Sequence, residues 1–204
     1  GKFKLDDPVN NYLTEFKIQG EDPQNPITFR HLLTHTSGLP GGDFGPVNVW
    51  SDGAPPTLND YLSKNLKVDN PPLKGVVYSN LAYTLIGYLV QKFSGVPYKQ
   101  YIQEHIFTPL EMTSTAFEPT PEMGERLSVP YVFDEKTGSQ VATMRLKASV
   151  WPAGLVYGTV LNQSNWLIAN LNGGEFKKKR IIDEKTLDQM LTIQYDQFKG
   201  GIEG

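Results

Sequence analysis

The residues best suited to chemistry form a short polar group at Tyr78, Ser79 and Asn80. A phenol can move protons, and an asparagine amide can hold a carbonyl group through its own donor and acceptor. The group stands directly before an apolar stretch, where a helix has N–H groups without helical partners. A structural interpretation stands beside the chemical one: Ser79 or Asn80 caps the helix, and Tyr78 is a half-buried aromatic residue.

The element that must position these side chains is a helix from about residue 81 to residue 94. Its apolar residues have the spacing of a helix buried along most of its circumference. They are Leu81, Ala82, Leu85, Ile86, Leu89, Val90 and Phe93. Gly95 and Pro97 predict its end, and Asn70-Pro71-Pro72 favours an extended approach to Tyr78. We therefore expect the polar group where an extended segment meets a buried helix.

The rest of the chain predicts a mainly α domain with long loops. We expect a short helix at 9–16 and about six longer ones, at 28–35, 57–66, 81–95, 97–109, 159–171 and 183–191. Four of them follow an N-cap residue, namely Thr28, Thr57, Thr159 and Asp183. Ser37-Gly38-Leu39-Pro40 predicts the end of the second helix, and Pro152-Ala153-Gly154 interrupts the chain before the sixth. Alternating residues at 127–143 predict one β-hairpin with its turn at 134–138.

Composition excludes several classes of function. The 204 residues are 39% hydrophobic, which suffices for a real core. A net charge of −3 argues against a nucleic-acid or anionic-membrane surface, and the one basic run, residues 177–180, follows Asn172-Gly173-Gly174 and reads as a solvated loop. No apolar run reaches membrane-spanning length. Without cysteine there is no disulfide and no thiolate site, so the compartment stays open.

Histidines and serines offer no complete site of their own. His31, His35 and His105 lack the carboxylate spacing of a metal site, so we expect them to be structural and predict neither metal nor cofactor. Ser37 has no adjacent base and no Gly-x-Ser-x-Gly elbow, which argues against a nucleophile. We expect His31, His35 and Ser37 to close a helix and fix a turn.

A longer string carries a family resemblance. Residues 27–40, Ile-Thr-Phe-Arg-His-Leu-Leu-Thr-His-Thr-Ser-Gly-Leu-Pro, resemble the serine β-lactamase and penicillin-binding-protein superfamily, in its class C and esterase-like branch. The Gly-Lys-x-x-Leu-Asp-Asp-Pro-Val opening, the Tyr78 turn, the loop at 152–154 and the glycines at 173–174 follow in the same order. The resemblance covers nearly the whole chain and favours an extracytoplasmic location.

The resemblance implies a particular fold. In that family a helical subdomain is inserted between two halves of an α/β sandwich. Residues 1–204 would then be a single helical subdomain with one hairpin, a fragment of a longer chain that lacks the flanking sheet. Such a fragment would expose an apolar face and would self-associate through it.

The resemblance also implies site residues. Of the family's three motifs, only Tyr-x-Asn is present: Tyr78 would be the catalytic proton relay, and Asn80 would bind the substrate amide. No Ser-x-x-Lys occurs in the sequence, and the late Lys/His-x-Gly strand would lie beyond residue 204. Lys136-Thr137-Gly138 spells the late motif on the predicted hairpin turn, so we do not assign it there.

Other positions bear on the family's acyl pocket. Trp151 would line that pocket as a substrate contact, as would Tyr157, although packing explains both aromatic residues equally well. Leu155 and Gly158 depart from the glycine and serine that the family often has there.

The implied reaction is acyl transfer through a serine acyl-enzyme, on a small-molecule or peptide substrate with a carbonyl centre. A phenol with an ordinary pKa near 10 needs nearby cations to act as a base, and those cations belong to the absent motifs. We therefore expect this chain alone to be inactive. Two alternatives stay open: a non-catalytic binding or structural module, and a hydrolase with an unrelated nucleophile.

Overall fold

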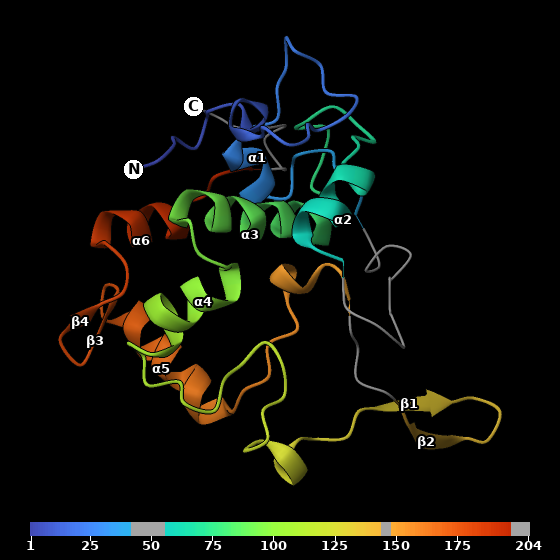
Figure 1. The fold of residues 1–204 in the computed structure, drawn as a ribbon, viewed down its shortest axis with the longest axis vertical. Coiled ribbons are helices and arrows are strands. Elements are labelled where there is room, and N and C mark those ends of the chain that lie inside the picture. The colour runs from blue at the N-terminus through green and yellow to red at the C-terminus, as the bar shows by residue number, and fades with distance from the viewer. Residues whose placement is uncertain (42–55, 144–147, 197–204) are drawn as a thin grey trace.

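The computed structural model describes residues 1–41, 56–143 and 148–196 (Figure 1). Helices are the main regular structure in these residues, as predicted. The helices are α1 (Phe29–Leu33), α2 (Leu58–Asn65), α3 (Asn80–Ser94), α4 (Tyr98–Ile102), α5 (Val160–Leu171) and α6 (Glu184–Leu191). Short 3₁₀ helices cover Val9–Tyr12, Gly124–Arg126 and Trp151–Ala153, and a π-helical turn at Gln103–Phe107 continues α4. The strands are β1 (Tyr131–Asp134), β2 (Ser139–Ala142), β3 (Glu175–Phe176) and β4 (Lys179–Arg180).

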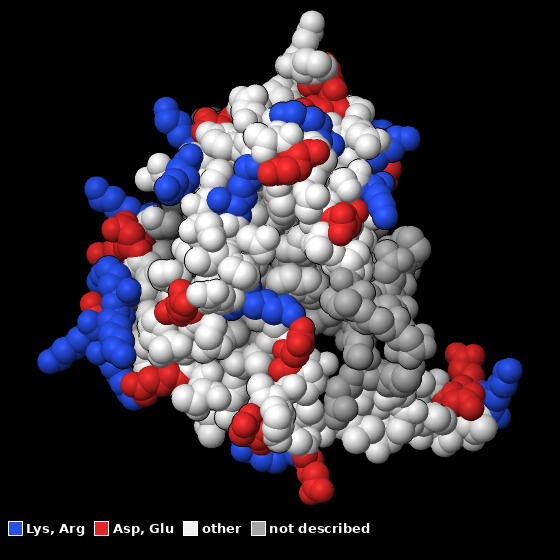
Figure 2. All heavy atoms as spheres, in the orientation of Figure 1, with Lys and Arg blue, Asp and Glu red and all other residues white. Residues whose placement is uncertain are grey.

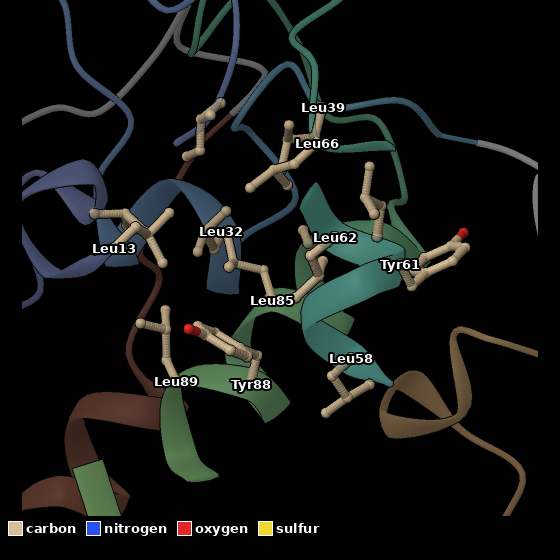
Figure 3. Close-up of a cluster of buried hydrophobic side chains, with 14 of the residues drawn as sticks. Leu13, Leu32, Leu39, Leu58, Tyr61, Leu62, Leu66, Leu85, Tyr88 and Leu89 are labelled. Atoms are coloured by element: carbon tan, nitrogen blue, oxygen red, sulfur yellow. The ribbon is translucent and has the colours of Figure 1, made fainter. Parts of the chain in front are cut away.

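Helix α3 is the centre of the main core. It contacts α1, α2, α4 and the 3₁₀ helix at 151–153 (Figure 1). Figure 3 shows Leu32 of α1, Leu62 of α2 and Leu85 of α3 pointing toward one another, and all three side chains are fully buried. Burying each such side chain contributes about 1.5–3 kcal/mol, so this contact fixes α3 and the turn that precedes it.

A second, smaller core joins the segment after α4 to α5. Phe107, Leu110 and Met112 pack with Ala169 of α5 and Phe176 of β3. The side-chain oxygen of Asn162 accepts the N–H of Ser114, which ties the two segments together.

The predicted helix starts are confirmed by capping hydrogen bonds. The side chains of Thr28, Thr57, Ser79, Thr159 and Asp183 each accept a backbone N–H two or three residues on. Gly95 ends α3 with a φ of 76°, as its position predicted.

Two helix boundaries were predicted wrongly. The helix expected at 9–16 is only a 3₁₀ turn at Val9–Tyr12, because Leu13 is extended and the Asn10 side chain accepts the N–H of Ile18 instead. Helix α1 stops at Leu33 rather than at the predicted His35, because His35 has a φ of 58° and cannot continue the helix. Gly38 has a separate purpose: at φ 72° its Cα approaches the carbonyl of Asn70 so closely that a Cβ would overlap it.

The strands form two antiparallel hairpins, one of them unexpected. β1 pairs with β2 to form the predicted hairpin, with Asp134 opposite Ser139, and this hairpin projects away from the helices (Figure 1). β3 pairs with β4, so the basic run at 177–180, which was predicted to be a loop, forms the turn and the second strand of a hairpin. Its turn residues Lys177 and Lys178 both have positive φ, which is the geometry of a tight hairpin turn. In the described ranges these are the only sheets.

The visible surface carries both signs of charge in a mixed pattern (Figure 2). Among the helices of the described segments, none has the length and apolar character needed to cross a membrane.

Candidate functional site

The site begins with a segment that is anchored on both sides of Tyr78. The N–H of Val77 donates to the carbonyl oxygen of His35 at 2.8 Å, and the N–H of Ser79 donates to Nδ1 of the same histidine at 3.0 Å. Ser79 is extended, with φ −131° and ψ 108°. Since neighbouring side chains on extended backbone point to opposite sides, Tyr78 and Asn80 emerge opposite to Ser79.

Ser79 is the residue that faces inward. It is fully buried, and its hydroxyl donates to the carbonyl oxygen of Pro40 at 2.7 Å while accepting the N–H of Ala82 at 3.1 Å. The structural interpretation is therefore correct for Ser79, which caps α3 and fixes the start of the helix.

Tyr78 is not a half-buried structural residue. Its side chain is 60% exposed, and its ring lies 4.5 Å from the imidazole of His35. Two other tyrosines of α3 behave differently: the hydroxyl of Tyr83 donates to the carbonyl oxygen of Leu33, and that of Tyr88 donates to Glu15. Burial raises the pKa of both phenols. By contrast, the Tyr78 hydroxyl has no hydrogen-bond partner among the described residues.

Asn80 is the first residue of α3 and is half-buried. Its backbone carbonyl accepts the hydroxyl of Thr84 at 2.8 Å. Its side-chain amide, like the Tyr78 hydroxyl, is unpaired within the part of the chain that the structure describes. A phenol and an amide are thus presented side by side with their polar atoms available to a ligand.

The two histidines of the signature string serve as backbone acceptors, in agreement with the structural expectation. Nδ1 of His31 accepts the N–H of Thr28, while the Thr28 hydroxyl accepts the N–H of His31, so the pair forms a reciprocal capping box. Burial lowers the pKa of His31 and of His35, which favours the neutral rings that these bonds require. No group of three metal-binding side chains comes together in the described ranges.

Trp151 lies in a different neighbourhood from Tyr78. Its ring packs against Tyr98 and Phe117, with centroids 5.7 and 5.6 Å away, and the ammonium of Lys99 sits 4.7 Å from its centre. Pro152 next to it packs against Gly87 in the middle of α3. Among the described contacts the packing role of Trp151 is evident, and its proposed substrate contact stays a prediction.

The remaining motif residues fall where local structure explains them. Ser37 is buried, and its hydroxyl oxygen accepts the N–H of Leu39. Thr137 donates to Asp134 inside the β1–β2 turn. Leu155 has a φ of 61°, the left-handed conformation in which glycine is favoured. Tyr157 exchanges two backbone hydrogen bonds with Ala116.

Val76 and Val77 beside Tyr78 are exposed as well. Two of the cavities among the described residues have volumes of about 180 and 400 Å³, and neither of these two is lined by Tyr78 or Asn80. Sequence reasoning missed the contribution of His35 to the turn. The sequence carries no direct signal for it, because the contact joins residues 44 positions apart.

Comparison with known proteins agrees with the family resemblance. A family model described as Beta-lactamase matches residues 1–199. The D-alanyl-D-alanine-carboxypeptidase/endopeptidase AmpH of Escherichia coli (strain K12) is 32% identical over 206 residues, which cover 97% of this chain and 49% of AmpH. The chain spans about half the length of the curated relatives it matches.

Solved structures show the same likeness. The D-amino acid amidase from Ochrobactrum anthropi SV3 is 29% identical with a TM-score of 0.69, covering 90% of this chain and 51% of the amidase. The octameric penicillin-binding protein homologue from Pyrococcus abyssi has a TM-score of 0.70 at 24% identity, covering 95% of this chain and 44% of that homologue, and shows the fold alone.

Proposed function

This chain belongs to the β-lactamase family, and we propose that it forms part of a serine hydrolase in which Tyr78 relays protons and Asn80 contacts the substrate. The observation that carries the proposal is the exposure of the Tyr78 side chain on a turn whose backbone is held by Ser79 and His35. A buried Tyr78 side chain would have excluded the proposed role.

The proposed reaction has two steps. A serine hydroxyl attacks the substrate carbonyl, its proton passes through Tyr78 to the leaving group, and an acyl-enzyme forms as the leaving group departs. Water then attacks the acyl-enzyme, gives up a proton through the same phenol, and releases the acid product and the free serine. The side-chain amide of Asn80 donates an N–H to the substrate carbonyl or accepts the N–H of the substrate amide.

The serine and the cations that would assist the Tyr78 phenol are proposed to come from outside these 204 residues, which contain no Ser-x-x-Lys. The exposure of Tyr78 supports this, since a hydrolytic site needs walls that exclude water. The chain would then be the helical subdomain of the family fold, and its apolar helix faces would meet the remainder.

The relatives suggest the substrate class. AmpH carries the name of a D-alanyl-D-alanine carboxypeptidase and endopeptidase, and the structural relative is a D-amino acid amidase. We propose an amide or peptide substrate with a D-residue at the scissile carbonyl. An amide partner for Asn80 fits such a substrate, because the amide offers both a carbonyl acceptor and an N–H donor.

A second candidate is a non-catalytic binding module that uses the same exposed turn. In that case Tyr78 and Asn80 would hold a ligand without turning it over.

A substrate panel separates the candidates. We would assay a D-alanyl-D-alanine peptide, a chromogenic cephalosporin and a p-nitrophenyl ester with the 204-residue chain and with the complete gene product that contains it. The proposal expects turnover by the complete product and none by the 204 residues. Turnover by neither would favour the binding module, and turnover by the 204 residues would require a different nucleophile.

A further inference from the structure

His35 holds the backbone on both sides of Tyr78. Its carbonyl oxygen accepts the N–H of Val77, and its Nδ1 accepts the N–H of Ser79. On extended backbone the N–H groups of residues 77 and 79 point the same way, so a single residue can take both. Two hydrogen bonds therefore hold the Tyr78 segment to His35, and one of them depends on the imidazole ring.

The conformation of His35 makes this double contact available. Its φ of 58° ends α1 and turns the residue toward α3. The imidazole lies 4.5 Å from the Tyr78 ring and 4.9 Å from the Tyr83 ring, and Tyr83 is itself tied to the carbonyl of Leu33. The titratable side chains that face His35 among the described residues are these two phenols, from the turn and from α3.

We propose that His35 is a positioning residue for Tyr78, and that its neutral imidazole acts as a proton-sensitive latch on the turn. The neutral ring has one acceptor nitrogen, and here Nδ1 is that acceptor, so Nε2 carries the proton. When the ring takes up a second proton at Nδ1, that nitrogen becomes a donor that faces the Ser79 N–H, which is also a donor. The hydrogen bond between them is then lost and the latch opens. The inference rests on the proposed role of Tyr78.

The direction of the pH response follows from the environment. Burial lowers the pKa of His35 from its ordinary value, so the latch stays closed at neutral pH and opens only in acid. The Ser79 cap on α3 is made by the serine hydroxyl, which does not titrate in this range. Protonation therefore loosens residues 77–79 while α3 remains capped.

Two substitutions separate the latch from simple packing. His35→Asn keeps an acceptor atom attached to Cγ, tolerates positive φ and cannot titrate. His35→Gly accepts the same backbone conformation but removes the acceptor. Both remove the ring, so a difference between them reports the hydrogen bond rather than the aromatic contact.

The direct test is an NMR titration of the Ser79 amide in the protein. The Ser79 amide shift should follow the protonation of His35 in the wild type and stay constant in His35→Asn. Hydrogen-exchange protection of that amide should fall by up to about tenfold in His35→Gly relative to His35→Asn, as loss of one hydrogen bond implies. A Ser79 amide that ignores His35 protonation in the wild type overturns the inference, whether or not the glycine variant folds.

Activity of the complete gene product gives the second readout. In the wild type, kcat/KM should fall in acid as His35 takes up a proton. In His35→Asn this fall should be absent, while kcat/KM at neutral pH is largely kept. An unchanged acid limb would overturn the latch. If the hydrolase proposal is wrong but the latch is right, the Ser79 amide shift will still follow the protonation of His35. The protein will then turn over none of the substrates.

Discussion

His31 and His35 use the same ring atom for the same purpose. In each, Nδ1 accepts a backbone N–H, from Thr28 in one case and from Ser79 in the other. Each bond needs a neutral ring, and burial supplies that condition by lowering both pKa values. The signature string thus contributes two backbone anchors, one to α1 and one to the Tyr78 turn.

These anchors predict an acid-sensitive fold. Because both folded-state pKa values lie below the unfolded value near 6.5, the unfolded chain takes up protons first as the pH falls. Their contribution to stability is complete above about pH 6.5 and is lost as the pH falls through the folded pKa values. Urea unfolding between pH 7.5 and 5 should show this loss.

A variant of His31 provides the matched control. Glutamine is a usual third residue of a capping box, so His31→Gln should keep the capping bond and flatten part of the pH dependence. Thr28→Ala should instead lower stability by about 1 kcal/mol at every pH in that range. If His31→Gln left the pH dependence unchanged, the His31 assignment would be wrong.

At the scale of elements, α3 depends on close packing at its middle. A Cβ on Gly87 would lie 2.5 Å from the Cβ of Pro152, so the 3₁₀ helix at 151–153 sits directly on the glycine. Glycine in a helix usually costs about 1 kcal/mol relative to alanine. Here the contact reverses that preference, because α3 and Pro152 would have to separate.

We expect Gly87→Ala to destabilise the protein by about 1–3 kcal/mol, as overpacking of a core does. The control is Gly75→Ala, where a Cβ would meet no atom within 4 Å and φ is not positive. Thermal unfolding of both variants checks the prediction. A more stable Gly87→Ala variant would show that helix propensity outweighs the contact.

Local signals explain which elements were predictable. The caps at Thr57, Ser79, Thr159 and Asp183 act over two or three residues, so the sequence alone reveals them. The end of α1 depends on the contact of His35 with residues 77–79, and the β3–β4 hairpin turns at two lysines rather than at Asn-Gly. Neither leaves a local pattern. For the site, the sequence indicated Tyr78 and Asn80 but not His35.

At the scale of the whole molecule, α5 and the segment at the end of α6 each expose large apolar side chains. The most exposed apolar side chains of these segments are Val160, Leu161, Leu171, Leu191 and Ile193, each at least 75% exposed. Exposed apolar side chains of this size are typical of interaction sites when they gather on one surface. We propose that the isolated chain self-associates through these side chains.

We expect Leu161→Lys combined with Leu171→Lys to lower the mass of the 204-residue chain in sedimentation toward that of the monomer. Charge at these two positions opposes association, and both side chains are exposed, so the fold should tolerate the change. The control is Gln163→Lys, an exposed polar position of the same helix. A wild-type chain that sediments as a monomer would refute self-association.

The central claim is that Tyr78 relays protons, and its most direct test is kcat for Tyr78→Phe in the complete gene product on the best substrate of the panel. Tyr131→Phe is the matched control, because Tyr131 on β1 is 59% exposed against 60% for Tyr78. We predict that Tyr78→Phe lowers kcat by about 10²–10⁴-fold, the usual contribution of general acid–base catalysis, while Tyr131→Phe leaves it nearly unchanged. Equal kcat values for the two variants would contradict the account.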